Sequence, residues 1–365
     1  MNKHQDRDGK GWAVSAADLA EDVDWIKRMG ADSVRTAHYP HAAEFYRLCD
    51  ARGGALPVYL ADAVYCGFRH GASPENYFVL RFYELSDRQR ETFLTSGRSK
   101  ECDRELNAGA SEDDRRALAC KNEFNNVFAG LVKRESVYAP DSGFAAFAGF
   151  LERHDEFILK PVRGTMGRGI EKLRTEQLGS VEDFYRSCRE NRILVEEVIC
   201  QHPVLSALNA DSVNSVRINA ARDRDGQTVL IGACLKCGGR GACTDNFHSG
   251  GVAYPIDMDT GRISGSGRNN TDIRDFIYHP GSGVRMPGLM VPYWTEITRC
   301  VRQAMERVPT VGYAGWDIAV TPDGPELIEG NYSWPGGNII QFDGVGKYTL
   351  LKKCLGEDHE QHTHR

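Results

Sequence analysis

Short runs of apolar residues, several of them alternating with polar ones, mark the second half of the chain. This pattern is typical of β-strands that bury one or both faces. Turn-forming residues such as Gly, Asn and Asp separate most of the runs. The predicted strands span residues 157–160, 192–199, 215–221, 229–236, 315–320 and 327–329.

Other segments repeat their apolar residues every three or four positions, which predicts amphipathic helices. The predicted helices span residues 15–30, 42–52, 111–128 and 293–308. Pro309 ends the last of them. Residues 32–38 are predicted to be a buried strand, whereas the aromatic-rich stretch 77–83 fits either a helix or a strand.

The composition is that of a globular chain of two or three domains, with 365 residues, 41% hydrophobic and 26% charged. The net charge is −6 and no block of Lys and Arg stands out, which argues against a nucleic-acid partner. The polar N-terminus lacks a signal-peptide pattern, and the longest apolar run, residues 144–151, is too short to span a membrane. With eleven irregularly spaced cysteines, these features predict a cytoplasmic protein with reduced thiols.

One predicted strand ends in Lys160 and runs into a glycine-rich loop. The loop contains Gly164, Thr165, Gly167 and Gly169. A lysine ammonium and backbone N–H groups that approach closely both suit phosphate oxygens. The loop matches neither the P-loop nor the Gly-x-Gly-x-x-Gly pattern, so a glycine-rich hairpin without a ligand is an equal alternative.

Two later strands carry Asp317 and then Glu329 and Asn331. Glu329 and Asn331 are two positions apart, which places both on one face of a strand. Oxygen atoms are the ligands that Mg²⁺ prefers, and such side chains are costly to bury without partners. We therefore predict a Mg²⁺ site at these three residues; the alternative is three polar residues at strand ends.

Between the loop and the acidic residues, one predicted strand leaves the sheet at Glu196-Glu197. From there to Ile199 the backbone can offer hydrogen bonds to an adenine edge. Arg217 lies on an otherwise apolar strand, so it should meet either an anionic ligand or a salt-bridge partner at the edge of the core.

A glycine-flanked loop follows, with three polar side chains at Asp245, Asn246 and His248. These residues either face the acceptor substrate or form an ordered turn.

In their chain order, these segments resemble the ATP-grasp superfamily, in particular the sugar-transfer-associated ATP-grasp group found with capsule and surface-polysaccharide genes. The resemblance extends over residues 60–355 approximately. It is carried by Lys121, Lys160-Pro161 with its glycine loop, Val195-Glu196-Glu197, Asn214-Ser-Val-Arg217, Asp245-Asn246 with Gly250-Gly251, Trp316-Asp317 and Glu329-Gly330-Asn331. It implies an α+β fold in which two subdomains clamp ATP.

The resemblance also implies a role for each residue. Lys121 and Lys160 would hold the phosphates under the glycine loop, Glu196 to Ile199 would line the adenine, Asp317, Glu329 and Asn331 would hold Mg²⁺, and Arg217 would steady the γ-phosphate or an acyl phosphate. The implied reaction turns a small-molecule carboxylate into an acyl phosphate, with ADP as product. An amine or sugar-linked acceptor, less often a thiol or hydroxyl, then displaces phosphate.

Residues 1–54 resemble a different family, glycoside hydrolase family 2 of the β-galactosidase type, early in its (β/α)₈ barrel. The resemblance is carried by residues 4–11, by Ser33-Val-Arg35-Thr-Ala-His38-Tyr39-Pro40 and by residues 45–50. The two carboxylates that such hydrolysis needs are missing. We therefore interpret this segment as a gene-fusion remnant or a misjoined reading frame rather than as a fragment that packs on the ATP-grasp body and helps to bind sugar.

The sequence thus predicts a glycosidase-like fragment, a helical or mixed subdomain, two ATP-grasp subdomains and a polar tail. The ranges are 1–54, 55–120, 121–195, 196–355 and 356–365. The favoured function is an ATP-dependent ligase. The alternatives are a nucleotide-binding protein without turnover and, through the N-terminal fragment, a glycoside hydrolase.

Overall fold

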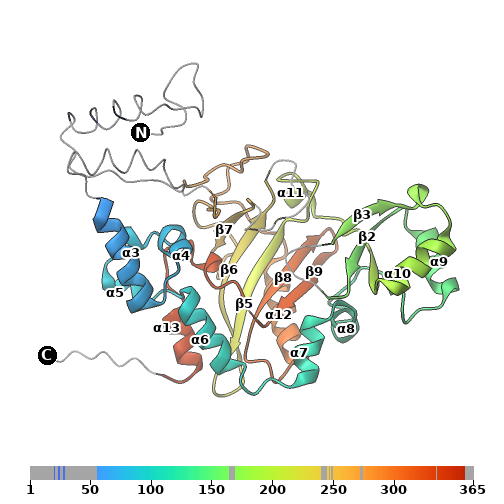
Figure 1. The fold of residues 1–365 in the computed structure, drawn as a ribbon, viewed down its shortest axis with the longest axis horizontal. Helices are drawn as coiled ribbons and strands as arrows, with labels where there is room; N and C mark the ends of the chain where they lie inside the picture. Colours follow the sequence, from blue (N-terminus) through green and yellow to red (C-terminus); the bar gives the residue numbers. More distant parts are fainter. Residues whose placement is uncertain are drawn as a thin grey trace.

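The chain folds around two antiparallel β-sheets, one of four strands and one of five (Figure 1). The computed structural model describes residues 56–163, 169–239, 245, 247, 250–271, 274–333 and 335–357, together with positions 20, 24 and 28. Within these residues, helices and antiparallel sheets occur side by side, which confirms the predicted α+β class. The helices and the strand predicted within residues 15–52 lie outside the described residues, apart from those three positions.

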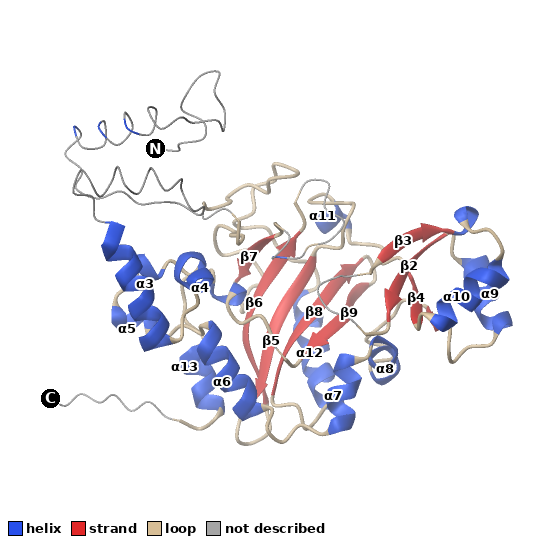
Figure 2. Ribbon diagram, viewed as in Figure 1, coloured by secondary structure: helices blue, strands red, loops and turns tan. Residues whose placement is uncertain are grey.

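The larger sheet has the strand order β7-β6-β5-β8-β9, and all its neighbouring strands are antiparallel. Its strands are β5 (Ser215–Arg222), β6 (Thr228–Cys237), β7 (Val252–Ile256), β8 (Tyr313–Thr321) and β9 (Gly324–Asn331). Four of them were predicted from the sequence, with bounds that differ by a few residues. In Figure 2 these strands form the red sheet at the centre of the molecule.

One face of the larger sheet packs against a long helix, α12 (Trp294–Arg307), as the apolar period of residues 293–308 predicted. Alternate residues of β5, such as Val216 and Ile218, point into this core and are completely buried. The short helices α7 (Glu112–Ala119) and α8 (Lys121–Val127) extend the same core. They replace the single helix predicted over residues 111–128, because the backbone becomes extended at Cys120.

The opposite face of the larger sheet is covered by helices from both ends of the described chain. They are α3 (Leu56–His70), α4 (Pro74–Val79), η1 (Phe82–Glu84), α5 (Asp87–Arg90), α6 (Ser96–Leu106), η4 (Ile339–Gln341) and α13 (Tyr348–Cys354). Buried residues of α3 and α6, such as Cys66 and Cys102, share a core with Ile231 and Tyr313 of the sheet. Much of the ambiguous stretch 77–83 is therefore helical.

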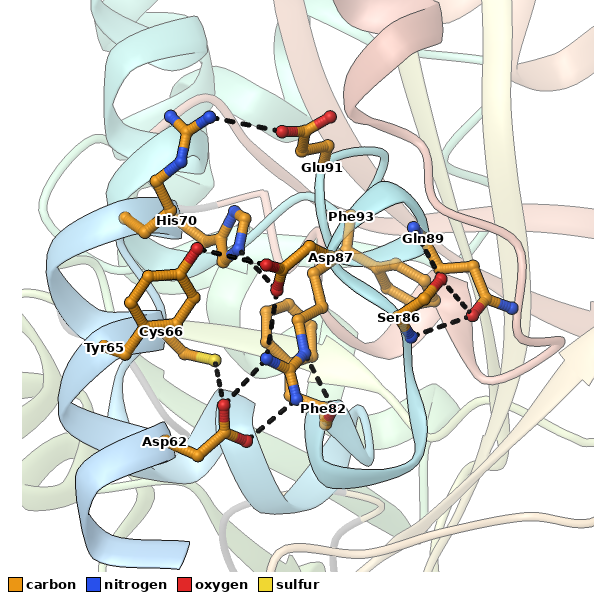
Figure 3. A network of polar contacts seen from close by, with 12 residues as sticks. Asp62, Tyr65, Cys66, His70, Phe82, Ser86, Asp87, Gln89, Glu91 and Phe93 are labelled. Carbon is orange, nitrogen blue, oxygen red and sulfur yellow. Dashed lines mark hydrogen bonds and ion pairs between the residues drawn. The ribbon is translucent and has the colours of Figure 1, made fainter. Parts of the chain in front are cut away.

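A charged contact fixes α3 within this helical layer (Figure 3). The guanidinium of Arg90 makes two hydrogen bonds of 2.8 Å to the two carboxylate oxygens of Asp62. Tyr77 donates its hydroxyl to Asp62 at 2.7 Å, and Arg90 also donates to the carbonyl of Phe82 at 2.9 Å. Because the Arg90 side chain is nearly buried, this pairing joins α3 firmly to the helices that follow it.

The smaller sheet has the order β1-β4-β2-β3, and helices cover one of its faces. Its elements are β1 (Ser136–Tyr138), α9 (Phe144–Arg153), β2 (Glu156–Pro161), β3 (Glu171–Arg174), η2 (Thr175–Gln177), α10 (Val181–Glu190) and β4 (Ile193–Glu197); α11 (Pro203–Ser206) follows. Phe147, Phe150, Phe157 and Val195 are buried between this sheet and its helices. The subdomain boundary expected at residue 195 falls inside β4, so the sheet continues across it.

Replacing Ile218 by Ala should lower the free energy of unfolding by about 2–5 kcal/mol, because a completely buried side chain leaves a cavity between β5 and α12. Ile277 is the matched control, since its side chain is 47% exposed, and Ile277→Ala should change stability by only about 0.5 kcal/mol. Urea unfolding followed by circular dichroism compares the two variants. Equal losses would contradict the placement of this core.

Candidate functional site

A row of charged side chains crosses the larger sheet on the face that the helices only partly cover. In the strand register, Arg217 of β5 lies opposite Asp317 of β8, and Asp317 lies opposite Glu329 of β9. Directly opposed residues of antiparallel strands point to the same face. Arg217, Asp317 and Glu329, which are far apart in the sequence, therefore lie side by side. Asn331 follows Glu329 by two residues and joins them on this face.

A shift in the register of β8 and β9 places Glu329 in this row. Asp317 pairs with Glu329, but the next residue, Ile318, pairs with Leu327, so β9 contains one extra residue here. Such a β-bulge lets Leu327 point into the core beside α12 while Glu329, two residues later, points to the opposite face. In a regular strand, Leu327 and Glu329 would share one face.

Arg217 and Asp317 form a buried ion pair. Nε and Nη2 of Arg217 lie 2.6 and 2.7 Å from the two carboxylate oxygens of Asp317, and Nζ of Lys236 lies 3.1 Å from Oδ1. Burial opposes the ionisation of Asp317, but the charges of Arg217 and Lys236 outweigh it and hold the pKa of this carboxyl well below its usual range. The carboxylate is therefore ionised at neutral pH.

Arg217 retains the capacity to bind a further anion. Its Nη1 donates to the carbonyl oxygen of Pro335 at 2.7 Å, so this bond and the two bonds to Asp317 use three of the five N–H groups of the guanidinium. The segment that contains Pro335 lies directly on β8, because a Cβ at Gly315 would come within 2.3 Å of the Pro335 carbonyl oxygen. Of the two sequence interpretations of Arg217, the salt bridge is present, and phosphate binding remains a prediction.

Glu329 continues the charged row on β9. Its side chain is exposed to solvent, yet the surrounding protein raises the pKa of its carboxyl by desolvation, and the negative charge of Asp317 raises it further. The side-chain amide of Asn331 donates a hydrogen bond of 3.1 Å to Glu329. Because the charge of Asp317 opposes the ionisation of Glu329, a cation bound beside the two carboxyl groups would favour the ionised form of Glu329.

The donor set fits one Mg²⁺ ion by its chemistry. Glu329 and Asn331 carry side-chain oxygens on the same face of β9, and oxygen is the ligand that Mg²⁺ prefers. Asp317 already accepts bonds from Arg217 and Lys236, so it would hold the ion less freely than Glu329. In the described part of the chain, no group of three or more His, Cys, Asp or Glu side chains is arranged for a metal, and the predicted set contains only two such residues.

The smaller sheet contributes a second charged group. On β2 and β4, Ile158 pairs with Glu196 and Lys160 pairs with Leu194, so Lys160 and Glu196 are diagonal neighbours on one face. The ammonium of Lys160 forms an ion pair with Oε2 of Glu196. The other face of this sheet packs under α9 and α10, so this face is directed toward α8 and the larger sheet.

Lys121 connects the two charged groups. It is the first residue of α8, and its ammonium donates to the carbonyl oxygen of Pro161 at 3.0 Å. Burial lowers the pKa of Lys121; Lys160 lowers it further, whereas Glu329 and Glu196 act against this shift. Charged groups of both sheets, Lys160 and Glu196 on the smaller and Glu329 on the larger, therefore influence the pKa of Lys121. The hydrogen bond to Pro161 places the ammonium of Lys121 at the end of β2, where Pro161 directly follows Lys160 in the chain.

The predicted adenine-binding residues are partly engaged within the protein. The carboxylate of Glu196 is occupied by its ionic partners, and the backbone N–H of Glu197 donates to the carbonyl of Glu135 at 2.9 Å. Ile199 lies beyond the last paired residue of β4 and is half-buried. A backbone contact to adenine therefore has to come from the residues after Glu197.

Asp245 of the predicted acceptor loop adjoins the charged row. Its Oδ2 accepts a 3.1 Å hydrogen bond from the backbone N–H of Ser215 and lies 3.6 Å from the ammonium of Lys236. Gly169 of the phosphate loop has a positive φ of +73°, as a tight glycine turn requires. The other loop residues lie outside the described residues, namely Gly164, Thr165, Gly167, Asn246 and His248.

Sequence reasoning missed two cations of this region. Lys236 sits between apolar neighbours on a predicted strand, which is the same signal that identified Arg217. Arg134 lies in a short polar stretch before β1 and gives no pattern, yet its side chain is only 3% exposed and connects Glu196 with Glu326 of β9. Its importance follows from the packing of the two sheets alone.

Replacing Arg217 by Met should lower the free energy of unfolding by about 3–5 kcal/mol, because it leaves the buried Asp317 with Lys236 as its cation. Arg186→Met is the matched control: Arg186 pairs with Asp183 on α10, but both side chains are 68% exposed, so the loss should stay below about 1 kcal/mol. Urea unfolding gives both values. Similar losses would show that the Arg217–Asp317 pair is not the buried contact described here.

Several solved ATP-grasp enzymes are similar to this chain. For the ATP-grasp ligase PsnB complexed with minimal precursor, Mg and ADP, the identity is 17% and the TM-score 0.40, with 68% of this chain and 61% of that chain covered. The VanG D-Ala:D-Ser ligase from Enterococcus faecalis is 14% identical with a TM-score of 0.41, and the match covers 68% of this chain and 63% of that one. D-alanyl-alanine synthetase A from Vibrio cholerae is 12% identical with a TM-score of 0.42, and the match covers 72% of each chain. The chain thus spans about three fifths of the length of PsnB and of the VanG ligase.

The N-terminal segment is similar to glycosidases. Residues 1–68 match the family of glycosyl hydrolases family 2, TIM barrel domain. The β-galactosidase of Pseudoalteromonas haloplanktis is 45% identical over 62 residues, which are 17% of this chain and 6% of that protein. The β-glucuronidase of Sus scrofa is 40% identical over 53 residues, 14% of this chain and 8% of that protein. The chain spans less than a tenth of these relatives, and the match runs beyond residue 54 into α3.

The part of the chain that contains both sheets matches a second family. Residues 136–354, more than half of the chain, match the family described as sugar-transfer associated ATP-grasp. This span includes both sheets and the charged row on β5, β8 and β9. The chain therefore belongs to the sugar-transfer associated ATP-grasp family, with a glycosidase-like fragment in front.

Proposed function

We propose that this protein is an ATP-dependent ligase that activates a carboxylate as an acyl phosphate and transfers the acyl group to an amine, or to a thiol or hydroxyl. Membership of the ATP-grasp family supports ATP-dependent ligation as the general reaction. The observation that supports the proposal most is that Arg217, Asp317 and Glu329 form one row across β5, β8 and β9, while Arg134 joins β9 to Glu196, the partner of Lys160. A triphosphate with its Mg²⁺ needs cations and oxygen ligands at such close quarters.

In this proposal, the chain supplies charge and position. Lys121 and Lys160 bind phosphate oxygens from the side of the smaller sheet, and the two unused N–H groups of Arg217 bind the γ-phosphate from the larger sheet. Glu329 and Asn331, with Asp317, hold the Mg²⁺. When bound, the ion neutralises charge that builds up on the phosphates. Positioning and charge neutralisation are the main sources of rate enhancement in phosphoryl transfer.

The proposed reaction proceeds in two displacements. A carboxylate oxygen of the substrate attacks the γ-phosphorus, the new O–P bond forms, and the bond to the β-phosphate oxygen breaks to release ADP. The acceptor nitrogen then attacks the acyl carbon, phosphate leaves, and the nitrogen loses a proton. Asp245, the charged acceptor-loop residue that the structure describes, stands beside Lys236 at the end of the charged row. We place the acceptor there, together with Asn246 and His248.

The substrate class follows from the family and not from the geometry. The sugar-transfer association of the family supports an acid or acceptor linked to surface-polysaccharide or sugar-conjugate biosynthesis. A nucleotide-binding protein without turnover would have the same fold, and only a measurement of ADP release separates it from a ligase. No helix in the described part of the chain is both long and apolar enough to cross a lipid bilayer.

Mg·ATP should raise the midpoint of thermal unfolding, because a ligand that binds the folded state stabilises it by about 2.7 kcal/mol at one hundred times its dissociation constant. The double substitution of Glu329→Gln with Asn331→Ala should remove the Mg²⁺ dependence of this shift and abolish turnover. The control is Glu190→Gln with Asn191→Ala, an exposed acid and amide at the end of α10, remote from the charged row. Full activity in the first double variant would overturn the metal assignment.

Release of ADP should depend on the addition of a suitable acid. The assay couples ADP formation to a spectroscopic signal and screens amino acids and amino- or uronic-acid sugars, each with and without an amine. A ligase gives acid-dependent ADP release and one equivalent of phosphate. A thermal shift with Mg·ATP but no ADP release with any acid would favour the protein without turnover.

A further inference from the structure

Glu196 is a single carboxylate that serves two cations. Its Oε2 lies 2.9 Å from Nε of Arg134 and also forms the ion pair with Lys160, while its Oε1 accepts a 2.7 Å hydrogen bond from the side-chain amide of Asn125. The Glu196 side chain that makes these contacts is only 2% exposed. Arg134 and Lys160 therefore share one negative charge, and neither of them is essential to neutralise it while the other remains.

The two cations are held very differently. Arg134 donates to Glu196 and, through Nη1, to the carboxylate of Glu326 at 2.8 Å and the carbonyl of Leu327 at 2.7 Å. Its own backbone N–H also donates to Glu326, at 3.0 Å. A guanidinium committed to several buried acceptors on two sheets cannot turn away without breaking all of them. Arg134 is thus a fixed partner of Glu196.

Lys160 has the opposite properties. It is near the end of β2, one residue before the strand gives way to the phosphate loop, and its side chain is 13% exposed. Its ammonium is a compact charge on a flexible stem, which can exchange one anion for another at little cost. It forms an ion pair with Glu196. If Lys160 binds a nucleotide phosphate instead of Glu196, Glu196 is still paired with Arg134 and is not left as an unpaired buried charge.

We propose that Arg134 is a positioning residue that permanently neutralises Glu196 and so releases Lys160 from Glu196 to the phosphates of the nucleotide. The same guanidinium fixes β9 against β4, two residues before Glu329, and thereby sets the distance from Lys160 to the metal side of the site. This inference rests on the proposed function, because it requires that Lys160 meets a nucleotide.

The test is a double-mutant cycle in which affinity for the Mg²⁺ complex of a non-hydrolysable imido analogue of ATP is measured by calorimetry. In Arg134→Met, Glu196 has Lys160 as its remaining cation and retains it, so affinity should fall roughly tenfold or more. Adding Glu196→Gln removes the charge that retains Lys160, so the double variant should recover affinity to within about threefold of Glu196→Gln alone. A purely structural role of Arg134 predicts no recovery.

Two further variants keep the test decisive. Arg134→Lys retains the charge but cannot reach Glu196 and Glu326 together, so it should show a smaller loss that Glu196→Gln again relieves, even if Arg134→Met does not fold. Arg153→Met removes an arginine from a solvent-exposed ion pair with Glu135 in the same half of the molecule and should leave affinity unchanged.

The outcomes separate the two proposals. If the unmodified protein binds the analogue but folded Arg134 variants bind it equally well, or if Glu196→Gln fails to restore affinity, the role of Arg134 is wrong and the ligase proposal stands. If the unmodified protein does not bind the analogue at all, the proposed function fails and the role of Arg134 fails with it.

Discussion

The buried guanidinium of Arg134 is the contact on which the geometry of the molecule depends. It joins β4 of the smaller sheet, through Glu196, to β9 at the edge of the larger one, through Glu326 and the neighbouring carbonyls. Two sheets that met only through apolar side chains would be free to slide, because burial has no preferred direction. Hydrogen bonds with a fixed fork geometry remove that freedom. The charged groups of the two sheets face each other at a fixed spacing as a result.

Each sheet also solves the same packing problem in the same way. One face is apolar and packs against helices, and the other carries an ion pair: Lys160 and Glu196 on the smaller sheet, Arg217 and Asp317 on the larger, whose second face also packs in part against helices. Two of the cations that we assign to phosphate binding, Lys160 and Arg217, are paired with carboxylates of the chain itself. Ligand binding at this place is therefore an exchange of partners rather than the filling of an empty charged surface, which keeps the ligand-free protein stable.

The sequence was sufficient for the elements whose apolar period is long or repeated, such as β5, β6, β8 and α12. It was not sufficient for features that depend on contacts between distant segments. The bulge that turns Glu329 to the site is visible only in the pairing of β9 with β8, and the order of residues alone would place Leu327 and Glu329 on one face. Arg134 is another example, because nothing near it in the chain indicates that both of its partners lie more than sixty residues away.

The position of α3 determines what the loss of the glycosidase-like stretch would do to the fold. Residues 56–68 belong at once to the stretch that matches glycosidases and to the helical cover of the larger sheet, where Asp62 and Cys66 meet Arg90 and the core. The stretch that matches glycosidases therefore ends in the last turn of α3 and not in a linker. Cutting the chain at the end of that match would remove the helix whose Cys66 shares a core with Ile231 and Tyr313 of the larger sheet, and this apolar surface would then face solvent.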